Sequence, residues 1–269
     1  MIPLEDNFTD VLGKALRGQT LSVHAAAARA GLDTGVVTRL LTGEFDENTA
    51  SALAAALKLD AAALIRLARG EYRPGVECPP ALIMTTTPYG DMTVNAYIVH
   101  DRASRDAAIF DTGADAAPLL EAIRTHDLNV VAIFLTHSHA DHIHALATLK
   151  RELGVEAWSS ELEPVRGTNT FRPGDLFNAG QHFIRTRLTP GHSPGGTTFV
   201  IEGPVLHAAM VGDALFAGSV GGVHDGYNET LSTIRREILG LRDDTVLCPG
   251  HGPLTTVALE KANNPFFAD

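Results

Sequence analysis

Hydrophobic positions follow two different patterns along the chain, and the pattern changes near residue 70. In the first part, short apolar segments with helical spacing each follow a residue that can cap a helix. These segments are Val23–Ala30 after Ser22, Thr34–Leu41 after Asp33, Thr49–Leu57 after Asn48 and Ala61–Ala68 after Asp60. Glycines behind two of them, Gly31 and Gly70, suit helix ends. We therefore predict a small all-α domain of roughly five helices at residues 1–70.

Residues 71–80 predict a linker, because Pro74, Gly75, Pro79 and Pro80 cannot continue a helix. From residue 81 onward, short apolar or alternating segments are separated by longer amphipathic ones. The predicted strands are Asn95–Val99, Ala107–Phe110, Val130–Leu135, His182–Leu188, Thr197–Ile201, Val205–Val211 and Thr245–Cys248. The predicted helices are Ala116–Thr125, His144–Glu152 and Glu229–Leu241. This pattern predicts a layered α/β domain with mixed sheets at residues 81–269.

Composition and charge narrow the classes of function. A chain with 45% hydrophobic and 20% charged residues has the balance of a globular protein. The net charge of -11, and 7 Lys/Arg against 8 Asp/Glu in residues 1–70, argue against capture of nucleic acid or of an anionic membrane. Without a long apolar run or a signal-like start, we expect a cytoplasmic protein with no membrane partner. The two cysteines, Cys78 and Cys248, are expected to be free thiols in a reducing compartment.

The densest group of metal-ligand side chains lies directly behind the predicted strand Val130–Leu135, and it comprises His137, His139, Asp141 and His142. In an extended turn, the first two histidines can project towards one point, while the aspartate and the third histidine reach a neighbouring point. Neutral imidazoles and carboxylates are suitable ligands for zinc or a similar first-row metal. The motif therefore predicts two adjacent cations rather than a polar surface loop.

Three more ligand-type residues follow later apolar strands. They are His192, Asp213 and His251, and each has Gly or Pro beside it in the chain. These neighbours allow a sharp turn and a close approach of the backbone. We therefore expect the three residues to complete the site begun by the histidine motif.

The order His137-x-His139-x-Asp141-His142, then His192, Asp213 and His251, resembles the signature of the metallo-β-lactamase superfamily. The resemblance spans residues 81–265 and implies an αββα sandwich with the site where strands end. It also implies a first metal on His137, His139 and His192, a second on Asp141, His142 and His251, and Asp213 bridging both. Two divalent ions are thus implied, with zinc favoured and iron or manganese as alternatives.

The implied mechanism uses a hydroxide bridging the metals, which is available near neutral pH because a bound cation lowers the pKa of water to about 7. Asp141 is the candidate catalytic residue, since it could orient that hydroxide or shuttle a proton as well as bind metal. Asp111, which closes a predicted strand, resembles the family's aspartate that orients a ligand histidine, with a simple turn residue as the alternative. His144 is expected to be a helix-face residue.

Within the superfamily, the segments from Gly212 to Ser219 and from Pro249 to Phe266 resemble short bacterial glyoxalase II-type proteins, which hydrolyse thioesters of the hydroxyacylglutathione class. The chain departs from full glyoxalase II because residues 1–269 leave no room for its C-terminal helical domain. It also has Gly222 and His224 where those enzymes tend to carry a basic and an aromatic residue. The expected substrate is therefore a small-molecule thioester or ester, without assured preference for glutathione.

Three alternatives stay open. A persulfide dioxygenase-like enzyme would hold one iron on His137, His192 and Asp213, and a lactonase would use the same hydrolytic site. The third is a DNA-binding regulator with a metallo-hydrolase-like sensor domain, because Leu21–Leu41 resembles an Xre/lambda-repressor helix-turn-helix. The predicted second helix, however, offers only Thr34, Thr38 and Arg39 to DNA. Dimerisation, giving a homodimer, or covering of the site mouth is the preferred role of this region.

Overall fold

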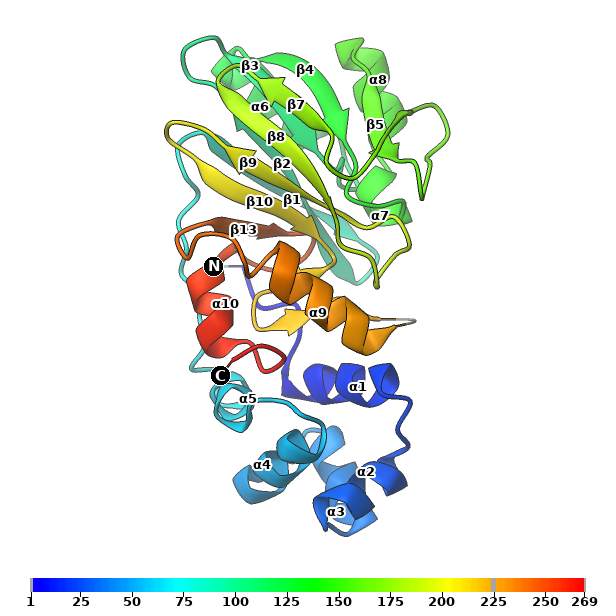
Figure 1. The fold of residues 1–269 in the computed structure, drawn as a ribbon. Coiled ribbons are helices and arrows are strands. Elements are labelled where there is room, and N and C mark those ends of the chain that lie inside the picture. Colours follow the sequence, from blue (N-terminus) through cyan, green and yellow to red (C-terminus); the bar gives the residue numbers. More distant parts are fainter. Residues whose placement is uncertain (1, 224–225, 269) are drawn as a thin grey trace.

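The computed structural model describes residues 2–223 and 226–268, and the N-terminal part is all helical, as predicted (Figure 1). Its helices are α1 (Phe8–Gly18), α2 (Val23–Ala30), α3 (Thr34–Leu41), α4 (Glu47–Ala56) and α5 (Ala61–Ala68). The start of α4 differs from the prediction. Asp46, not Asn48, accepts a hydrogen bond from the backbone N–H of Thr49 and caps the helix.

Two six-stranded sheets follow the helices. The first runs in chain order through β1 (Leu82–Tyr89), β2 (Met92–His100), β3 (Asp106–Phe110), β4 (Asn129–Phe134), β5 (Ala157–Ser160) and β6 (Asn169–Phe171). The second has the order β14 (Thr255–Thr256), β13 (Val246–Pro249), β10 (His207–Gly212), β9 (Thr197–Glu202), β8 (His182–Leu188) and β7 (Leu176–Ala179). A separate hairpin joins β11 (Leu215–Phe216) to β12 (Ser219–Val220). Both large sheets mix parallel and antiparallel pairs, as predicted.

The helices around the sheets are α6 (Ala117–His126), α7 (Ala140–Ile143), α8 (Leu146–Leu153), α9 (Tyr227–Glu237) and α10 (Val257–Asn263). The helix predicted at His144–Glu152 corresponds to α8, which begins two residues later, at Leu146, and the short helix α7 precedes it across the turn of His144 and Ala145. Strands β1, β5, β11, β12, β14, β6 and β7 were not predicted. The last two are short and largely exposed, so they carry no apolar pattern.

The sheets face one another across a core of phenylalanine rings. Phe110, Phe134 and Phe199 stack or tilt against each other with ring centroids 5.4 to 5.5 Å apart. On the outer side of the first sheet, Leu119 of α6 and Leu149 of α8 are fully buried in a second cluster. Helices α9 and α10 lie beside the second sheet (Figure 1). The arrangement is the αββα sandwich that the sequence predicted.

The N-terminal helices pack directly against the sandwich, beneath α9 and α10 (Figure 1). One continuous core joins the two parts, and it includes Val11, Leu12, Leu64 and Leu67 from the helices and Leu215, Val220, Ile234 and Phe266 from the sandwich side. The backbone N–H of Asp60 donates to the carbonyl of Pro265 at 2.8 Å. The division at residues 70 and 81 stays a prediction, but the helices are in close contact with the rest of the chain.

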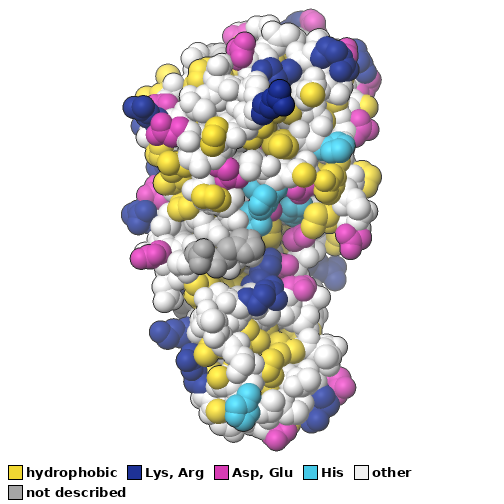
Figure 2. Space-filling model, turned by 90° about the vertical axis from the view of Figure 1, so that its right-hand side faces the viewer, with side chains coloured by type: hydrophobic (Ala, Val, Ile, Leu, Met, Phe, Trp, Pro, Cys, Tyr) yellow, Lys and Arg dark blue, Asp and Glu magenta, His cyan; other side chains and the backbone are white. Residues whose placement is uncertain are grey.

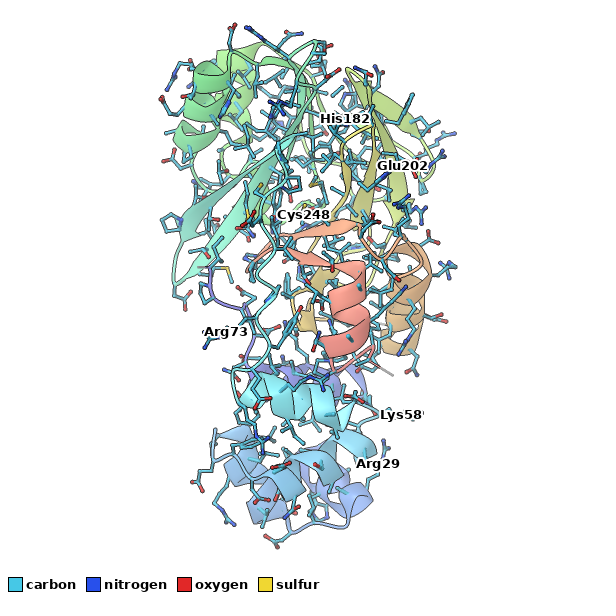
Figure 3. The ribbon with its side chains drawn as sticks, turned by 90° about the vertical axis from the view of Figure 1, so that its left-hand side faces the viewer. Arg29, Lys58, Arg73, His182, Glu202 and Cys248 are labelled. Atoms are coloured by element: carbon cyan, nitrogen blue, oxygen red, sulfur yellow. The ribbon has the colours of Figure 1, made fainter. Side chains whose placement is uncertain are left out.

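Residues 71–79 contain no helix or strand. Arg73 lies on this segment, which runs along the side of the molecule from the helices to the sandwich (Figure 3). Tyr72, in contrast, is buried, and its hydroxyl donates to Glu260 at 2.5 Å. Among the described residues, no helix is long and apolar enough to cross a membrane.

Candidate metal centre

Several histidine side chains gather near the middle of one face of the molecule (Figure 2). The motif follows strand β4, and Asp111, at the end of the neighbouring strand β3, holds it. The carboxylate of Asp111 accepts from the backbone N–H of Thr136 at 2.7 Å and from its hydroxyl at 2.8 Å. The same carboxylate lies 2.8 Å from Nδ1 of His142. Asp111 therefore fixes both ends of the motif, as the sequence led us to expect.

The three downstream residues come to the same place from the second sheet. His192 follows β8, Asp213 follows β10 and His251 follows β13. Strands β10 and β13 are parallel neighbours, so their carboxyl ends present Asp213 and His251 at one edge. All seven predicted ligand residues are thus brought together.

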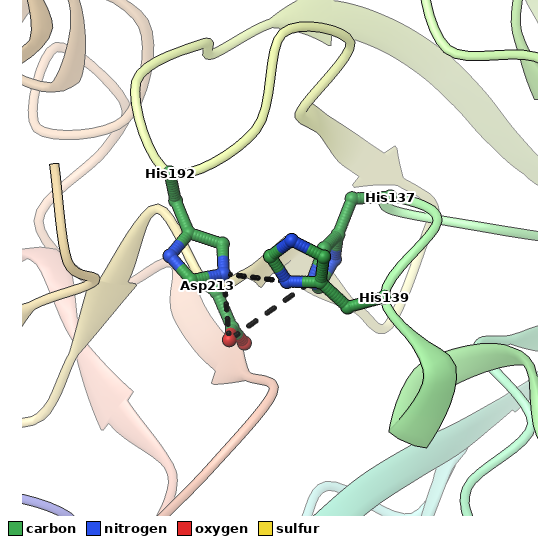
Figure 4. Close-up of side chains that lie close together, drawn as sticks. All are labelled: His137, His139, His192 and Asp213. Carbon is green, nitrogen blue, oxygen red and sulfur yellow. Dashed lines mark hydrogen bonds and ion pairs between the residues drawn. The ribbon is translucent and has the colours of Figure 1, made fainter. Parts of the chain in front are cut away.

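Their donor atoms form two groups, in each of which all atoms lie within 4.8 Å of one another. The first group is His137, His139, His192 and Asp213, shown in Figure 4, and the second is Asp141, His142 and His251. Asp213 stands between the groups. Its Oδ2 is 3.3 Å from Nε2 of His192, and its Oδ1 is 3.3 Å from Nε2 of His142.

The chemistry of this donor set fits divalent cations. Nε2 of His137 and Nε2 of His142 are buried and, among the described residues, have no hydrogen-bond partner of ordinary geometry. Buried polar nitrogens without a partner are costly unless another group satisfies them. Both nitrogens face the buried carboxylate of Asp213, as ligands of a shared ion would. Neutral imidazoles together with a carboxylate form a common donor set for first-row metals.

In His137, His142, His192 and His251, Nδ1 is held by a neighbour, which turns Nε2 towards the centre. Nδ1 of His251 lies 2.6 Å from the carbonyl of Thr93, and Nδ1 of His192 lies 3.1 Å from the carbonyl of Gly222. His137 is held at Nδ1 by the hydroxyl of Thr136, at 2.9 Å. Such outer contacts fix ring orientation and tautomer in metal sites. The two backbone carbonyls carry no side-chain signal, so sequence reasoning missed them.

Electrostatics show that the centre attracts positive charge. Burial opposes protonation of His142, but the charges of Asp213 and Asp111 outweigh it and raise its pKa to about 10. For His251, burial is likewise outweighed by hydrogen bonds to Asp141 and Asp213, which raise its pKa to about 11. His137 shows the reverse, because burial and then the nearby His142 hold its pKa well below the usual range. The raised pKa values of His142 and His251 therefore reflect the negative charge of the neighbouring carboxylates.

A second carboxylate that the sequence analysis did not single out holds two of the ligand loops together. Glu163 accepts from the backbone N–H of Ser138 at 2.8 Å and from its hydroxyl at 2.5 Å. It also accepts from the backbone N–H of Gly195 at 2.8 Å. Burial raises the pKa of Glu163, but these donors outweigh burial and lower it. The residue thus joins the loop of His137 and His139 to the loop of His192.

The other histidines that the structure describes lie outside both donor groups. His144 lies in the turn between α7 and α8 rather than on a helix face as expected, and it packs edge-on against the ring of Tyr89, with centroids 5.7 Å apart. His100 stacks on His126, and His182 bonds the carbonyl of His100, far from the motif in the chain. His224, which entered the comparison with glyoxalase II, lies outside the described residues.

Comparison with known proteins agrees with the class of metallo-hydrolase that fold and centre define. The model of the metallo-beta-lactamase superfamily matches residues 89–251. The chain therefore belongs to the metallo-beta-lactamase superfamily. The curated relative hydroxyacylglutathione hydrolase GloC, from Haemophilus influenzae, is 34% identical over 188 residues, which are 60% of this chain and 87% of GloC.

Solved structures give the same picture. ETHE1 from Myxococcus xanthus is 25% identical with a TM-score of 0.59, covering 68% of this chain and 83% of that chain. TTHA1623, solved in a di-iron-bound form, is 28% identical with a TM-score of 0.56, covering 68% of this chain and 100% of that chain. The N-terminal helices precede the range that the family model matches.

Proposed function

We propose that this chain hydrolyses a small-molecule thioester or ester, as a two-metal enzyme of the hydroxyacylglutathione hydrolase type. The observation that carries the proposal is the pair of donor groups on either side of Asp213. The name and 34% identity of GloC support the thioester class. The ions themselves would supply a Lewis acid for the substrate carbonyl and water activated near neutral pH.

Asp141 would orient the attacking water. Its carboxylate lies 3.3 Å from Nε2 of His251 and 3.4 Å from Nε2 of His142. Burial raises the pKa of Asp141, but the hydrogen bond to His251 and the charge of His142 lower it to about 2. A carboxylate with so low a pKa stays ionised at neutral pH, so it accepts a hydrogen bond more readily than it stores a proton.

Neither of two potential nucleophiles close to the ligand residues in the chain is suited to covalent catalysis. The hydroxyl of Ser138 donates to the carboxylate of Glu163, and not to an imidazole that could take its proton as a general base. Cys248 is buried between the sheets (Figure 3), and burial raises the pKa of its thiol well above the usual range. This supports direct attack by water.

Zinc remains the favoured metal in the proposal, with iron or manganese as alternatives. TTHA1623, which shares the fold at 28% identity, was solved with two irons, so the donor set alone does not select zinc.

Gly222 adds no side chain to the site, and a Cβ there would meet nothing within 4 Å. We therefore propose that recognition depends mainly on groups next to the scissile carbonyl.

A mononuclear iron oxidoreductase is the second candidate, because ETHE1 shares the fold and His137, His192 and Asp213 lie in one donor group. The complete second group favours the hydrolase. Three measurements on the purified chain separate the two candidates. They are a metal count, hydrolysis assays with hydroxyacylglutathione, simple thioester, ester and lactone substrates, and oxygen consumption with a persulfide as substrate. Two metals with thioester or ester turnover are expected. One iron with oxygen consumption would overturn the hydrolase proposal.

DNA binding stays an alternative, but the charge of α3, the predicted recognition helix, does not support it. Its one cationic side chain, Arg39, lies 3.7 Å from the carboxylate of Glu44. A recognition helix needs donors that are free to reach bases and phosphates. Homodimer formation and a cytoplasmic location likewise stay predictions.

A further inference from the structure

Lys14, on helix α1 of the N-terminal region, extends into the wall of the sandwich beside the metal centre. Its side chain is only 13% exposed, and it pairs with the carboxylate of Asp6, which is 9% exposed. The ammonium group donates to the carbonyl of Val220 at 2.7 Å. It also lies 4.8 Å from the ring centroid of Phe216. Lys14 therefore contacts both strands of the β11–β12 hairpin.

The Val220 end of this hairpin leads to His192. Gly221 follows, and a Cβ at that position would overlap the carbonyl oxygen of Asp213 and lie 3.1 Å from Nδ1 of His192. The carbonyl of Gly222 then holds Nδ1 of His192 at 3.1 Å. Only one residue, Gly221, thus separates Val220, whose carbonyl Lys14 binds, from Gly222, whose carbonyl orients this histidine.

The Phe216 end of the hairpin leads to His251. The two rings meet edge to face, with centroids 5.7 Å apart and planes 84° apart. A cation over an aromatic face is attracted to the ring and restrains its position. The N-terminal segment lies on the same loop, because a Cβ at Gly252 would be 3.1 Å from the backbone nitrogen of Glu5.

We infer that Lys14 is a positioning residue, which sets His192 through Val220–Gly222 and His251 through Phe216. The inference rests on the proposed two-metal centre, and it makes the N-terminal helices part of that centre. The two histidines belong to different donor groups, so one side chain from outside the matched family range supports both groups. The role needs a buried cation, since a neutral side chain could not pair with Asp6, bind the carbonyl and restrain the ring together.

The test measures metal affinity of the full chain by competition with a chelator, together with the visible spectrum of the cobalt-substituted protein. The variant is Lys14→Met. Its matched control is Arg66→Met, because Arg66 of α5 also donates from the helices to a carbonyl across the junction, that of Ala262, at 2.7 Å. Helix α10, where Ala262 lies, supplies no ligand residue. We expect affinity at both donor groups to fall about tenfold in Lys14→Met, with a changed cobalt spectrum, and neither change in Arg66→Met.

Lys14→Met leaves the buried Asp6 without its cation, which lowers the stability of the fold. A second pair of variants therefore separates folding from positioning. Asp6→Asn keeps the bond of Lys14 to Val220, whereas Asp6→Asn with Lys14→Met removes both charges. We expect parental affinity and spectrum in the single variant and the tenfold loss in the double variant. Equal affinity in the two, or an equal loss in Arg66→Met, overturns the inference. A parental chain that binds fewer than two metals refutes the proposed function instead.

Discussion

Gly250 lies so close to the carboxylate of Asp213 that a side-chain carbon at position 250 would overlap Oδ1 of that residue. The same carbon would lie 2.5 Å from Cε1 of His142. The backbone N–H of Gly250 also donates to the carbonyl of Gly212 at 2.9 Å, which ties the ends of β10 and β13 together. Glycine at this position is therefore what lets two proposed ligands from different sheets meet.

Gly250→Ala should disturb the metal centre without disturbing the sandwich. The added methyl group must push Asp213 or His142 away, and small errors in ligand position commonly reduce metal affinity or activity about 10- to 100-fold. Metal content by elemental analysis and the melting temperature of the metal-free chain measure the two effects. Gly222→Ala is the control, because a Cβ there meets nothing within 4 Å. Full metal content in Gly250→Ala would contradict the placement of these ligands.

Asp213→Ala and His251→Ala should differ in how many metals they lose. Asp213 lies between the donor groups, whereas His251 belongs only to the second. We expect Asp213→Ala to weaken both metals and His251→Ala to weaken mainly one, as counted by titration with metal. His144→Ala, outside both groups, serves as the control. Retention of both metals by Asp213→Ala would refute the shared centre.

Alkylation of thiols should leave hydrolysis largely intact. Cys78 is exposed and Cys248 is fully buried, so a reagent should label Cys78 in the folded chain. Neither thiol belongs to a donor group. The check is labelled mass and activity on the same sample, with metal content measured before and after. Loss of turnover with both metals retained and only Cys248 labelled would require a covalent mechanism to be considered.

The seven proposed ligands could be found from the sequence because each follows a strand and carries a ligand-type side chain. The sites of Thr93 and Gly222 could not, since they act through backbone carbonyls, which every residue has. Lys14 was equally hidden, because its acceptor Val220 lies 206 residues away in the chain. No local pattern marks such a pair.

The elements of the fold likewise differ in how well the sequence predicts them. Strands such as β4 and β9 are buried and apolar, so they were predicted, while β6 pairs by backbone hydrogen bonds and buries only Phe171. The start of α4 was misplaced because Asp46 and Asn48 are both good capping residues, and in the structure it is Asp46 that accepts from both the backbone N–H and the hydroxyl of Thr49.

Glu260 should make the stability of the chain depend on pH. Its fully buried carboxylate accepts from Tyr72 and Thr255 at one oxygen and from Gly218 and Asn264 at the other. Burial raises its pKa, and the hydrogen bonds offset this only in part. The folded chain therefore holds this proton more tightly than the unfolded chain. The stability that Glu260 contributes is fully present below the unfolded pKa, near 4.5, and is lost as pH rises through the raised folded pKa.

Glu260→Gln removes this loss, because an amide has no proton to release. The NH₂ group of Gln must take the place of one carboxylate oxygen and so face two former donors. The hydroxyls of Tyr72 and Thr255 can turn to accept from it, but the N–H groups of Gly218 and Asn264 cannot. The variant should therefore be less stable than the parent near pH 4.5. As pH rises, the difference should shift in favour of Gln by about 1.4 kcal/mol for each unit by which the pKa of Glu260 is raised. Denaturant unfolding of both metal-free chains from pH 4.5 to 8 measures the shift, with Glu77→Gln, an exposed carboxyl, as control. A difference that is constant with pH would mean that Glu260 has the same pKa in the folded and unfolded chains, so that its four donors fully offset burial.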